Sequence, residues 1–192
     1  ENEKQVYAWT TSWGVTTRLI GGLIMTHGDD DGMIVPPRLA PQHVVILPDL
    51  RGDDSSAEVL EYCTKLKAAL ENQIFKGAPV RVLLDQRDIR GVEKTWQHIK
   101  RGVPLRVEIG PRDVESDSCF VGRRDQSPKQ KKSIPRSEFV GTVHEQLESM
   151  QRELFNRALE NRQRVTKPID SLEEFRDYFT PDPVSYTHLT LP

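Results

Sequence analysis

The stretch HVVILP at residues 43–48 is short, apolar and closed by proline, which is typical of a buried β-strand. Two similar stretches follow, VRVLLD at residues 80–85 and PLRVEIG at residues 104–110. Between them, residues 55–77 and 91–102 repeat apolar side chains at helical spacing. A strand, helix, strand, helix and strand in succession predict an α/β domain, with a mixed or parallel sheet covered by helices.

The first of these helices has a signal at each end. Ser55 and Glu58 stand in capping-box register at its start, and Gly77 follows its end. Its predicted apolar line consists of Val59, Cys63, Leu66, Leu70 and Ile74.

The chain after residue 110 predicts one more strand and two more helices. SCFVGRR at residues 118–124 is the strand, and the basic stretch at residues 125–137 is expected to be a loop. Residues 138–164 predict a long helix, and residues 170–179 a short one. The apolar side of the long helix would be Phe139, Val143, Leu147, Met150 and Leu154.

The chain before residue 43 predicts a strand that leads into a helix. QVYAWTTSWG at residues 5–14 alternates as a strand does, and TTRLIGGLIMTH at residues 16–27 has a helical apolar face. Turn residues and then three prolines come next, so we expect a domain boundary at residues 36–41 that few contacts cross.

Composition narrows the class of protein. A formal net charge of −2 argues against a wholly basic nucleic-acid binder, although the stretches RGVPLR and RRDQSPKQKK could meet phosphate. Cys63 and Cys119 form no metal or disulfide pattern, so we expect no metal site and a reducing cytoplasm. The longest apolar run, residues 19–25, is too short to span a membrane. The beginning of the sequence has neither Met nor a signal-peptide pattern, which favours a start inside a larger protein.

Two stretches carry a family resemblance. TSWGVTTRLIGGLIMTHGDDDGMIVPPRLAP at residues 11–41 resembles the third signature motif of class II aminoacyl-tRNA synthetases, in its prolyl form. RGVPLRVEIGPRD at residues 101–113 resembles the anticodon-binding domain of the same enzymes. The resemblance implies a five-stranded mixed sheet with flanking helices, preceded by the strand and helix that end an antiparallel catalytic domain.

This resemblance divides the chain into four parts. Residues 1–36 would end the catalytic domain, residues 37–164 would form the anticodon-binding domain, and residues 165–182 would begin a C-terminal extension. Residues 183–192 lack the charged residues and the helical periodicity of the preceding sequence, and we interpret them as a non-native tail.

The resemblance also implies roles for residues near the beginning of the chain. Arg18 matches the arginine that binds the ATP phosphates, where a guanidinium meets charge that develops on oxygen. Ser12, Trp13 and Gly14 match the pocket for proline and its adenylate. The acidic turn HGDDDG does not fit a calcium loop, because its carboxylates are consecutive.

The expected anticodon-binding residues lie at strand ends and loops of the second domain. Positively charged side chains there would bind phosphate, and side chains of either charge would form hydrogen bonds with the exposed edges of single-stranded bases. Relatives carry a Pro-Gly-Trp-Lys-Phe stretch that this chain replaces, keeping a lysine. The candidates are Arg87, Asp88, Lys94, Lys100, Arg106, Glu108 and Arg112, with Arg101 beside them.

By resemblance, the parent protein is a cytoplasmic homodimer that activates proline with ATP and Mg²⁺ and transfers it to tRNA(Pro). This chain alone is expected to be inactive. Two alternatives stay open: a noncatalytic RNA-binding or interaction module on an anticodon-binding fold, and a sister class II synthetase for threonine, glycine or histidine.

Overall fold

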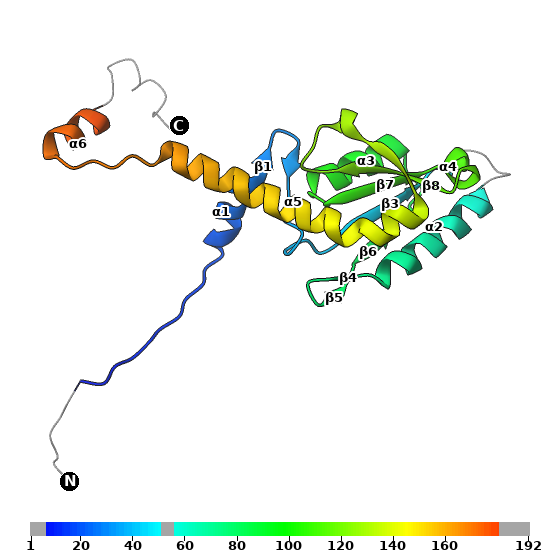
Figure 1. Cartoon of the computed structure of the whole chain (residues 1–192), viewed down its shortest axis with the longest axis horizontal. Helices are drawn as coiled ribbons and strands as arrows, with labels where there is room; N and C mark the ends of the chain where they lie inside the picture. The colour runs from blue at the N-terminus through cyan, green and yellow to red at the C-terminus, as the bar shows by residue number, and fades with distance from the viewer. Residues whose placement is uncertain (1–6, 51–55, 181–192) are drawn as a thin grey trace, which may run out of the picture. The chain divides into compact units, whose positions relative to one another are not determined.

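The computed structural model describes residues 7–50 and 56–180. Ser55 of the expected capping box and the proposed tail at residues 183–192 lie outside the described residues. At the centre is a five-stranded sheet in the order β6-β3-β7-β8-β9 (Figure 1). The strands are β3 (Val44–Pro48), β6 (Val82–Leu84), β7 (Leu105–Ile109), β8 (Ser118–Arg123) and β9 (Lys132–Pro135).

The sheet is mixed, as the sequence predicts. Strand β3 runs parallel to both β6 and β7, whereas β8 pairs antiparallel with β7 and with β9. Parallel neighbours need a helical crossover, and the helices α2 (Ser56–Glu71) and α3 (Gly91–Lys100) supply the two crossovers. The α/β class with a five-stranded mixed sheet is confirmed.

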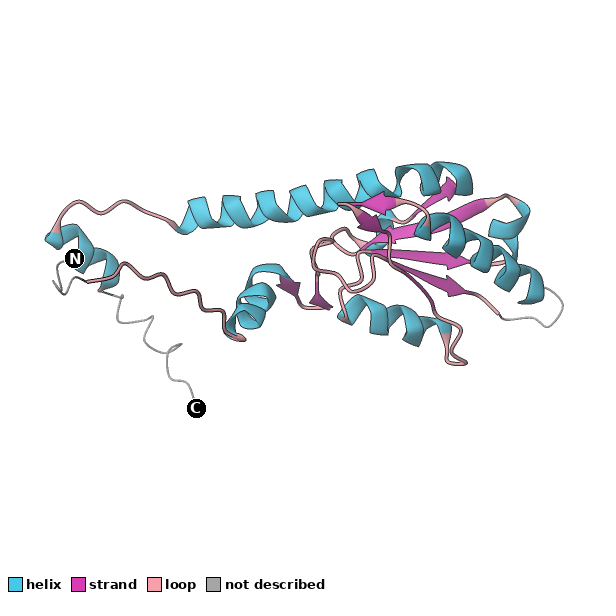
Figure 2. Ribbon diagram, turned by 90° about the horizontal axis from the view of Figure 1, so that it is seen from below, coloured by secondary structure: helices cyan, strands magenta, loops and turns pink. Residues whose placement is uncertain are grey.

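Helices cover both faces of the sheet (Figure 2). Val44 and Ile46 of β3 pack with α2 and with α5 (Arg136–Val165) in the main core. Val45 and Leu47 point to the opposite face, where α3 lies, because side chains of a strand alternate. All five residues expected on the apolar side of the long helix are buried: Phe139, Val143, Leu147, Met150 and Leu154.

The basic stretch at residues 125–137 is more ordered than the loop we expected. It contains a 3₁₀ turn, η1 (Pro128–Gln130), followed by the edge strand β9. The prediction was wrong because β9 is short, polar and largely exposed, as protected edge strands often are. Such a strand lacks the apolar alternation that identifies strands in sequence.

The strand expected at residues 5–14 is absent from its described part. Residues 7–16 have no regular structure, and no described residue pairs with them. A strand needs a neighbour for its backbone hydrogen bonds, which the sequence pattern does not supply. The following helix, α1 (Arg18–His27), forms as predicted, but none of its side chains is buried. A methyl group added at Gly21 or Gly22 would meet open space, so these glycines show no close packing in the described chain.

The segment between α1 and the sheet packs onto the α/β unit. It forms a hairpin of β1 (Gly28–Asp29) and β2 (Gly32–Met33). Both carboxylate oxygens of Asp29 accept hydrogen bonds from the buried guanidinium of Arg124. Gly102 has a φ of +74° and would bring a methyl group within 2.6 Å of a backbone oxygen of this hairpin. More contacts therefore cross the proline-rich stretch than we expected.

A substitution at Ile34 tests whether the segment after the hairpin packs on the α/β unit, because Ile34 is buried with Met150 and Leu154 of α5. We expect Ile34→Val to lower the free energy of unfolding by about 1 kcal/mol, since it removes one buried methylene. Ile20→Val removes the same group from an exposed position and serves as the control. Equal effects of the two substitutions in urea unfolding would show that the hairpin segment is not packed in solution.

Residues 156–180 belong to a second compact unit. Its short helix α6 (Leu172–Phe179) confirms the prediction for residues 170–179, and the hydroxyl of Ser171 caps it by accepting from the backbone of Glu174. The remaining elements are a small hairpin of β4 (Ile74–Phe75) and β5 (Ala78–Pro79), and the five-residue helix α4 (Pro111–Glu115). Within the described ranges, no helix is long and apolar enough to cross a membrane.

Candidate functional site

A groove of about 1470 Å³ opens at the carboxyl ends of the three parallel strands. Its floor comes from the ends of β3 and β7, and one wall comes from residues 86–90 and the first turns of α3. Phe120 of β8 and Lys131, just before β9, also line the groove. Crevices outside the carboxyl ends of parallel strands are frequent ligand sites, because the connecting loops diverge there. The volume suits a stretch of several residues or nucleotides better than one small molecule.

The groove presents both signs of charge beside two aromatic rings. The indole of Trp96 is 42% exposed, and the ammonium of Lys100 lies 5.8 Å from its centroid. Lys131 lies 5.6 Å from the ring of Phe120 and also forms an ion pair with Glu108. The lining charges are Asp49, Arg87, Asp88, Arg90, Glu93, Lys94, Glu108, Asp113 and Lys131.

A buried carboxylate organises the wall that carries Arg87. Asp85 follows β6 and accepts from Nε and Nη2 of Arg87, at 2.8 and 2.6 Å. It also accepts from Nε2 of the buried His98, at 2.8 Å. The Arg87 guanidinium, together with the His98 hydrogen bond, holds the pKa of this carboxyl well below its usual range. Asp85 is therefore ionised at neutral pH, and it fixes both Arg87 and α3.

Two further contacts complete this wall. Nη1 of Arg87 donates to the side chain of Gln97 at 2.9 Å, and Nζ of Lys94 donates to the backbone oxygen of Asp85 at 3.4 Å. Lys94 is buried along most of its length while it still lines the groove. Arg87 and Lys94 are thus held by protein contacts, and each keeps donors that a ligand can share.

The sequence-based candidates fall into two groups. Arg87, Asp88, Lys94 and Glu108 line the groove, and the structure brings them together from β7, α3 and the loop before it. The other four do not line it: Lys100, Arg101, Arg106 and Arg112. Lys100 still reaches it indirectly through Trp96.

Arg106 differs most from the expectation of a strand end or loop. It is the second residue of β7 and is 2% exposed, on the sheet face opposite the main core. Burial lowers the pKa of its guanidinium, and its Nε and Nη1 atoms have no hydrogen-bond partner among the described residues. A bound molecule in the groove cannot touch Arg106 unless the side chain moves.

The sequence-based candidates leave out several groove residues, among them both aromatic side chains. Trp96 lies in the stretch 91–102 whose apolar side chains were expected to face the core, but α3 buries Ile99 and leaves Val92 and Trp96 exposed. Phe120 reaches the groove only because β8 extends the sheet beside β7. Lys131 belongs to the basic stretch RRDQSPKQKK, which was expected to meet phosphate, and it lines the groove just before β9. The clearest available signal was the helical position of Trp96 next to Lys94 and Lys100, since cations and aromatics together suit nucleic acid.

The candidate ATP and proline residues are not assembled into a pocket by the described chain. Arg18 is the first residue of α1 and is exposed, with its backbone amide 3.3 Å from the hydroxyl of Thr16. Ser12, Trp13 and Gly14 are exposed and have no regular structure, and Trp13 is 93% exposed.

Comparison with known proteins agrees with this geometry. The family described as "Anticodon binding domain" matches residues 43–146, which include β3 to β9 and the whole groove. Because the match covers more than half of the chain, the chain belongs to the anticodon-binding domain family of class II tRNA synthetases.

Two of the similar curated proteins are named as proline–tRNA ligases. The chain is 53% identical to proline–tRNA ligase 2 of Anaeromyxobacter dehalogenans, over 92% of this chain and 35% of that protein. It is 56% identical to the proline–tRNA ligase of Rhodopirellula baltica, over 90% of this chain and 34% of that protein. The chain thus spans about a third of the length of these curated relatives.

A solved structure shows the same fold. The crystal structure of prolyl-tRNA synthetase from Cryptosporidium parvum, complexed with L-proline and AMP, has a TM-score of 0.76 and 35% sequence identity. The similarity covers 86% of this chain and 33% of that one.

Proposed function

We propose that this chain is the anticodon-reading part of a proline–tRNA ligase, and that its groove binds the anticodon loop of tRNA(Pro). The observation that carries the proposal is the groove itself, which combines cations, carboxylates and two aromatic rings within a family match for anticodon binding. Anticodon bases are unpaired, so their edges are free for hydrogen bonds and their faces for stacking.

Each part of the groove has a role in this proposal. Arg87 and Lys94 offer donors to guanine O6 and N7 or to phosphate, whereas Asp88 and Glu108 accept from base amino groups. Trp96 and Phe120 offer stacking surfaces. Asp85 positions Arg87, because the two hydrogen bonds between their side chains fix the plane of the guanidinium group.

The parent protein is proposed to activate proline with ATP and to transfer it to tRNA(Pro). Arg18 would meet the ATP phosphates, and Ser12, Trp13 and Gly14 would line the proline and adenylate pocket. The AMP and L-proline in the name of the Cryptosporidium parvum structure support these two ligands. Mg²⁺ would accompany the ATP phosphates, as it usually does where a protein binds a nucleotide.

The remaining assignments are proposals about the whole protein. Residues 1–36 end the catalytic domain, residues 37–164 form the anticodon-binding domain, residues 165–182 begin an extension, and residues 183–192 are non-native. The parent is a cytoplasmic homodimer. The exposed apolar face of α1 supports a role beside further protein, since the side chains of Leu19, Ile20 and Ile24 are 51–66% exposed.

Trp96→Ala tests the stacking role of the groove. We expect it to weaken binding of the tRNA(Pro) transcript to this chain by about 5- to 150-fold, because stacking of one base contributes about 1–3 kcal/mol. The measurement is a fluorescence titration at two salt concentrations, since phosphate contacts make the affinity fall with salt.

Phe155→Ala is the matched control, because Phe155 is an exposed aromatic side chain of α5 that does not line the groove. Its affinity for the transcript should stay within about twofold of the unchanged chain. Equal losses for the two variants would place the RNA elsewhere on the surface.

A further inference from the structure

The acidic turn HGDDDG, which does not fit a calcium loop, forms the hairpin of β1 and β2 directly after α1. Helix α1 ends at His27 and β1 begins at the next residue, so no loop separates the two elements. The backbone amide of Gly28 still donates to the carbonyl oxygen of Ile24, in the last turn of the helix. The contacts that hold this hairpin therefore also fix the end of α1.

Arg124 joins the hairpin to the α/β unit, and this residue is 6% exposed. Its Nη1 and Nη2 atoms donate to the two carboxylate oxygens of Asp29, the first at 2.8 Å, and Nε donates to the backbone oxygen of Ile99 at 3.0 Å. The hydrogen bonds from Arg124 lower the pKa of Asp29, which is therefore ionised at neutral pH. One buried guanidinium thus ties the hairpin to the last turn of α3, in a paired geometry that fixes direction as well as distance.

The backbones of the hairpin and of the end of α3 are in direct contact. Gly32 has a φ of +126°, and a methyl group there would lie 2.7 Å from the Cα atom of Lys100. Only glycine permits both this φ and this close approach. After the hairpin, the amide of Val35 donates to the carbonyl oxygen of Gly102 at 3.2 Å. The hairpin cannot shift along α3 without losing these contacts.

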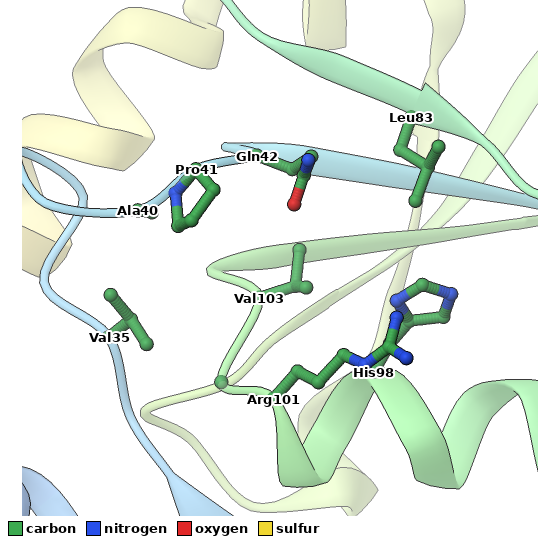
Figure 3. A pocket seen from close by; sticks show the side chains of 9 residues that line it. Val35, Ala40, Pro41, Gln42, Leu83, His98, Arg101 and Val103 are labelled. Atoms are coloured by element: carbon green, nitrogen blue, oxygen red, sulfur yellow. The ribbon is translucent and has the colours of Figure 1, made fainter.

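The chain that follows the hairpin runs past the same end of α3. Figure 3 shows Val35, Pro41 and Val103 around a small pocket of about 260 Å³ at this junction. Apolar packing is therefore incomplete here, and the hydrogen bonds to α3 and to the loop after it are what fix the segment at this point. Ile34 packs against α5, so both helices hold the segment.

Helix α3 connects this junction with the groove. Its first two turns carry Lys94 and Trp96 of the groove wall, and its last turn carries Ile99, which accepts from Arg124. The helix has ten residues and is about 15 Å long. An anticodon bound in the groove and the helix that begins with Arg18 are therefore both fixed relative to this one short element.

We propose that Asp29 and Arg124 form a positioning pair, which sets the orientation of α1, and of the catalytic domain beyond it, relative to the groove. The inference rests on the proposed function, because it concerns the transfer of proline to a tRNA whose anticodon is bound here. Transfer requires one tRNA to reach the groove and the prolyl-adenylate together, whereas formation of the adenylate does not. A small error in orientation should therefore slow transfer alone.

Asp29→Asn in the full-length protein tests this role. The asparagine oxygen can still accept from the amide of Asp31, as Asp29 does at 3.0 Å, but its amide group presents hydrogens to Arg124. Single-turnover transfer from prolyl-adenylate to tRNA(Pro) should be about 5- to 50-fold slower. Proline-dependent exchange of pyrophosphate with ATP, and the affinity of this 192-residue chain for the tRNA(Pro) transcript, should stay within about twofold.

Asp30→Asn is the matched control, because Asp30 is an exposed aspartate of the same turn, and it should leave all three measurements within about twofold. An equal loss of exchange and transfer in Asp29→Asn would overturn the proposal, since it would show a general effect on folding. Unchanged transfer would overturn it as well, and weaker binding of the transcript by this chain would place the effect in the groove instead. A failure of the proposed function looks different: the unchanged protein would then neither support the exchange nor acylate tRNA(Pro), and the inference would fall with it.

Discussion

Asp85→Ala is expected to lower the free energy of unfolding by about 2–3 kcal/mol, because it removes hydrogen bonds to a charged group and leaves a buried donor unsatisfied. The carboxylate is buried and accepts hydrogen bonds from Arg87 and His98. Its removal leaves the Nε2–H of His98 buried without a partner and frees the loop that carries Arg87. Chemical unfolding at pH 7 measures the loss, and the melting temperature should fall by about 4–12 °C.

Asp88→Ala is the matched control, because Asp88 is an exposed aspartate in the same loop. Its effect should stay within about 0.5 kcal/mol, as for most exposed substitutions. If the two alanine variants were equally stable, Asp85 would not be the residue that holds α3 to the sheet.

The stabilisation of the fold by Asp85 should weaken as the pH falls. Its pKa is lower in the folded protein than in the unfolded chain, chiefly because of Arg87. The stabilisation is therefore fully present above the unfolded pKa of about 4 and is lost as the pH falls below it. The stability difference between the unchanged chain and Asp85→Ala should shrink between pH 5 and about pH 3. A difference that grows on acidification would contradict this assignment.

The second large effect is expected for Arg18→Ala in the full-length protein. Proline-dependent exchange of pyrophosphate with ATP should fall by about 10²- to 10⁴-fold, because a fixed guanidinium stabilises charge on the phosphate oxygens in the transition state. Arg18 begins α1 and is exposed in this chain, so its loss should not affect folding. Equal melting temperatures for the full-length protein and its Arg18→Ala variant would confirm that folding is not affected.

Two further variants sharpen the interpretation. Arg18→Lys keeps the charge but loses the paired donors, so its exchange rate should fall between those of Arg18→Ala and the unchanged protein. Arg38→Ala removes another exposed arginine and should leave exchange unchanged within about threefold. An exchange rate for Arg18→Ala as high as that of Arg38→Ala would remove Arg18 from the ATP site.

The fold could be predicted from the sequence where its signals are local. The apolar runs at residues 43–48 and 104–110 became β3 and β7, and the helical spacing in residues 91–102 became α3. The helix predicted for residues 55–77 was right only as far as Glu71: α2 ends there, and Ile74, expected on its apolar line, lies in β4 and is 57% exposed. The edge strand β9 could not be predicted, because its pairing with β8 depends on a neighbour and not on its own residues. The strand expected at residues 5–14 was wrong for the related reason that nothing in the described chain pairs with it.

The groove was only partly predictable for the same physical reason. Arg87, Asp88, Lys94 and Glu108 were identified from charge at strand ends and from the family resemblance, and all four line the groove. Phe120 could not be placed there without the order of the strands, since β8 extends the sheet on the far side of β7.

Burial was the other property that the residue pattern left open. The alternation of β7 puts Leu105 and Val107 in the main core and turns Arg106 to the opposite face, where the protein also covers it. Charge alone had suggested an accessible residue, which shows that a charged side chain on a central strand need not reach solvent.

The central claim is that the groove reads anticodon bases, and the most direct test compares tRNA(Pro) with a transcript whose two anticodon guanines are replaced. We predict that this chain binds the altered transcript more weakly by about 1–3 kcal/mol per base, at a moderate salt concentration that limits nonspecific phosphate binding. Equal affinity for the two transcripts would contradict base readout. It would show that the groove holds only the phosphate backbone, and would favour a general RNA-binding module instead.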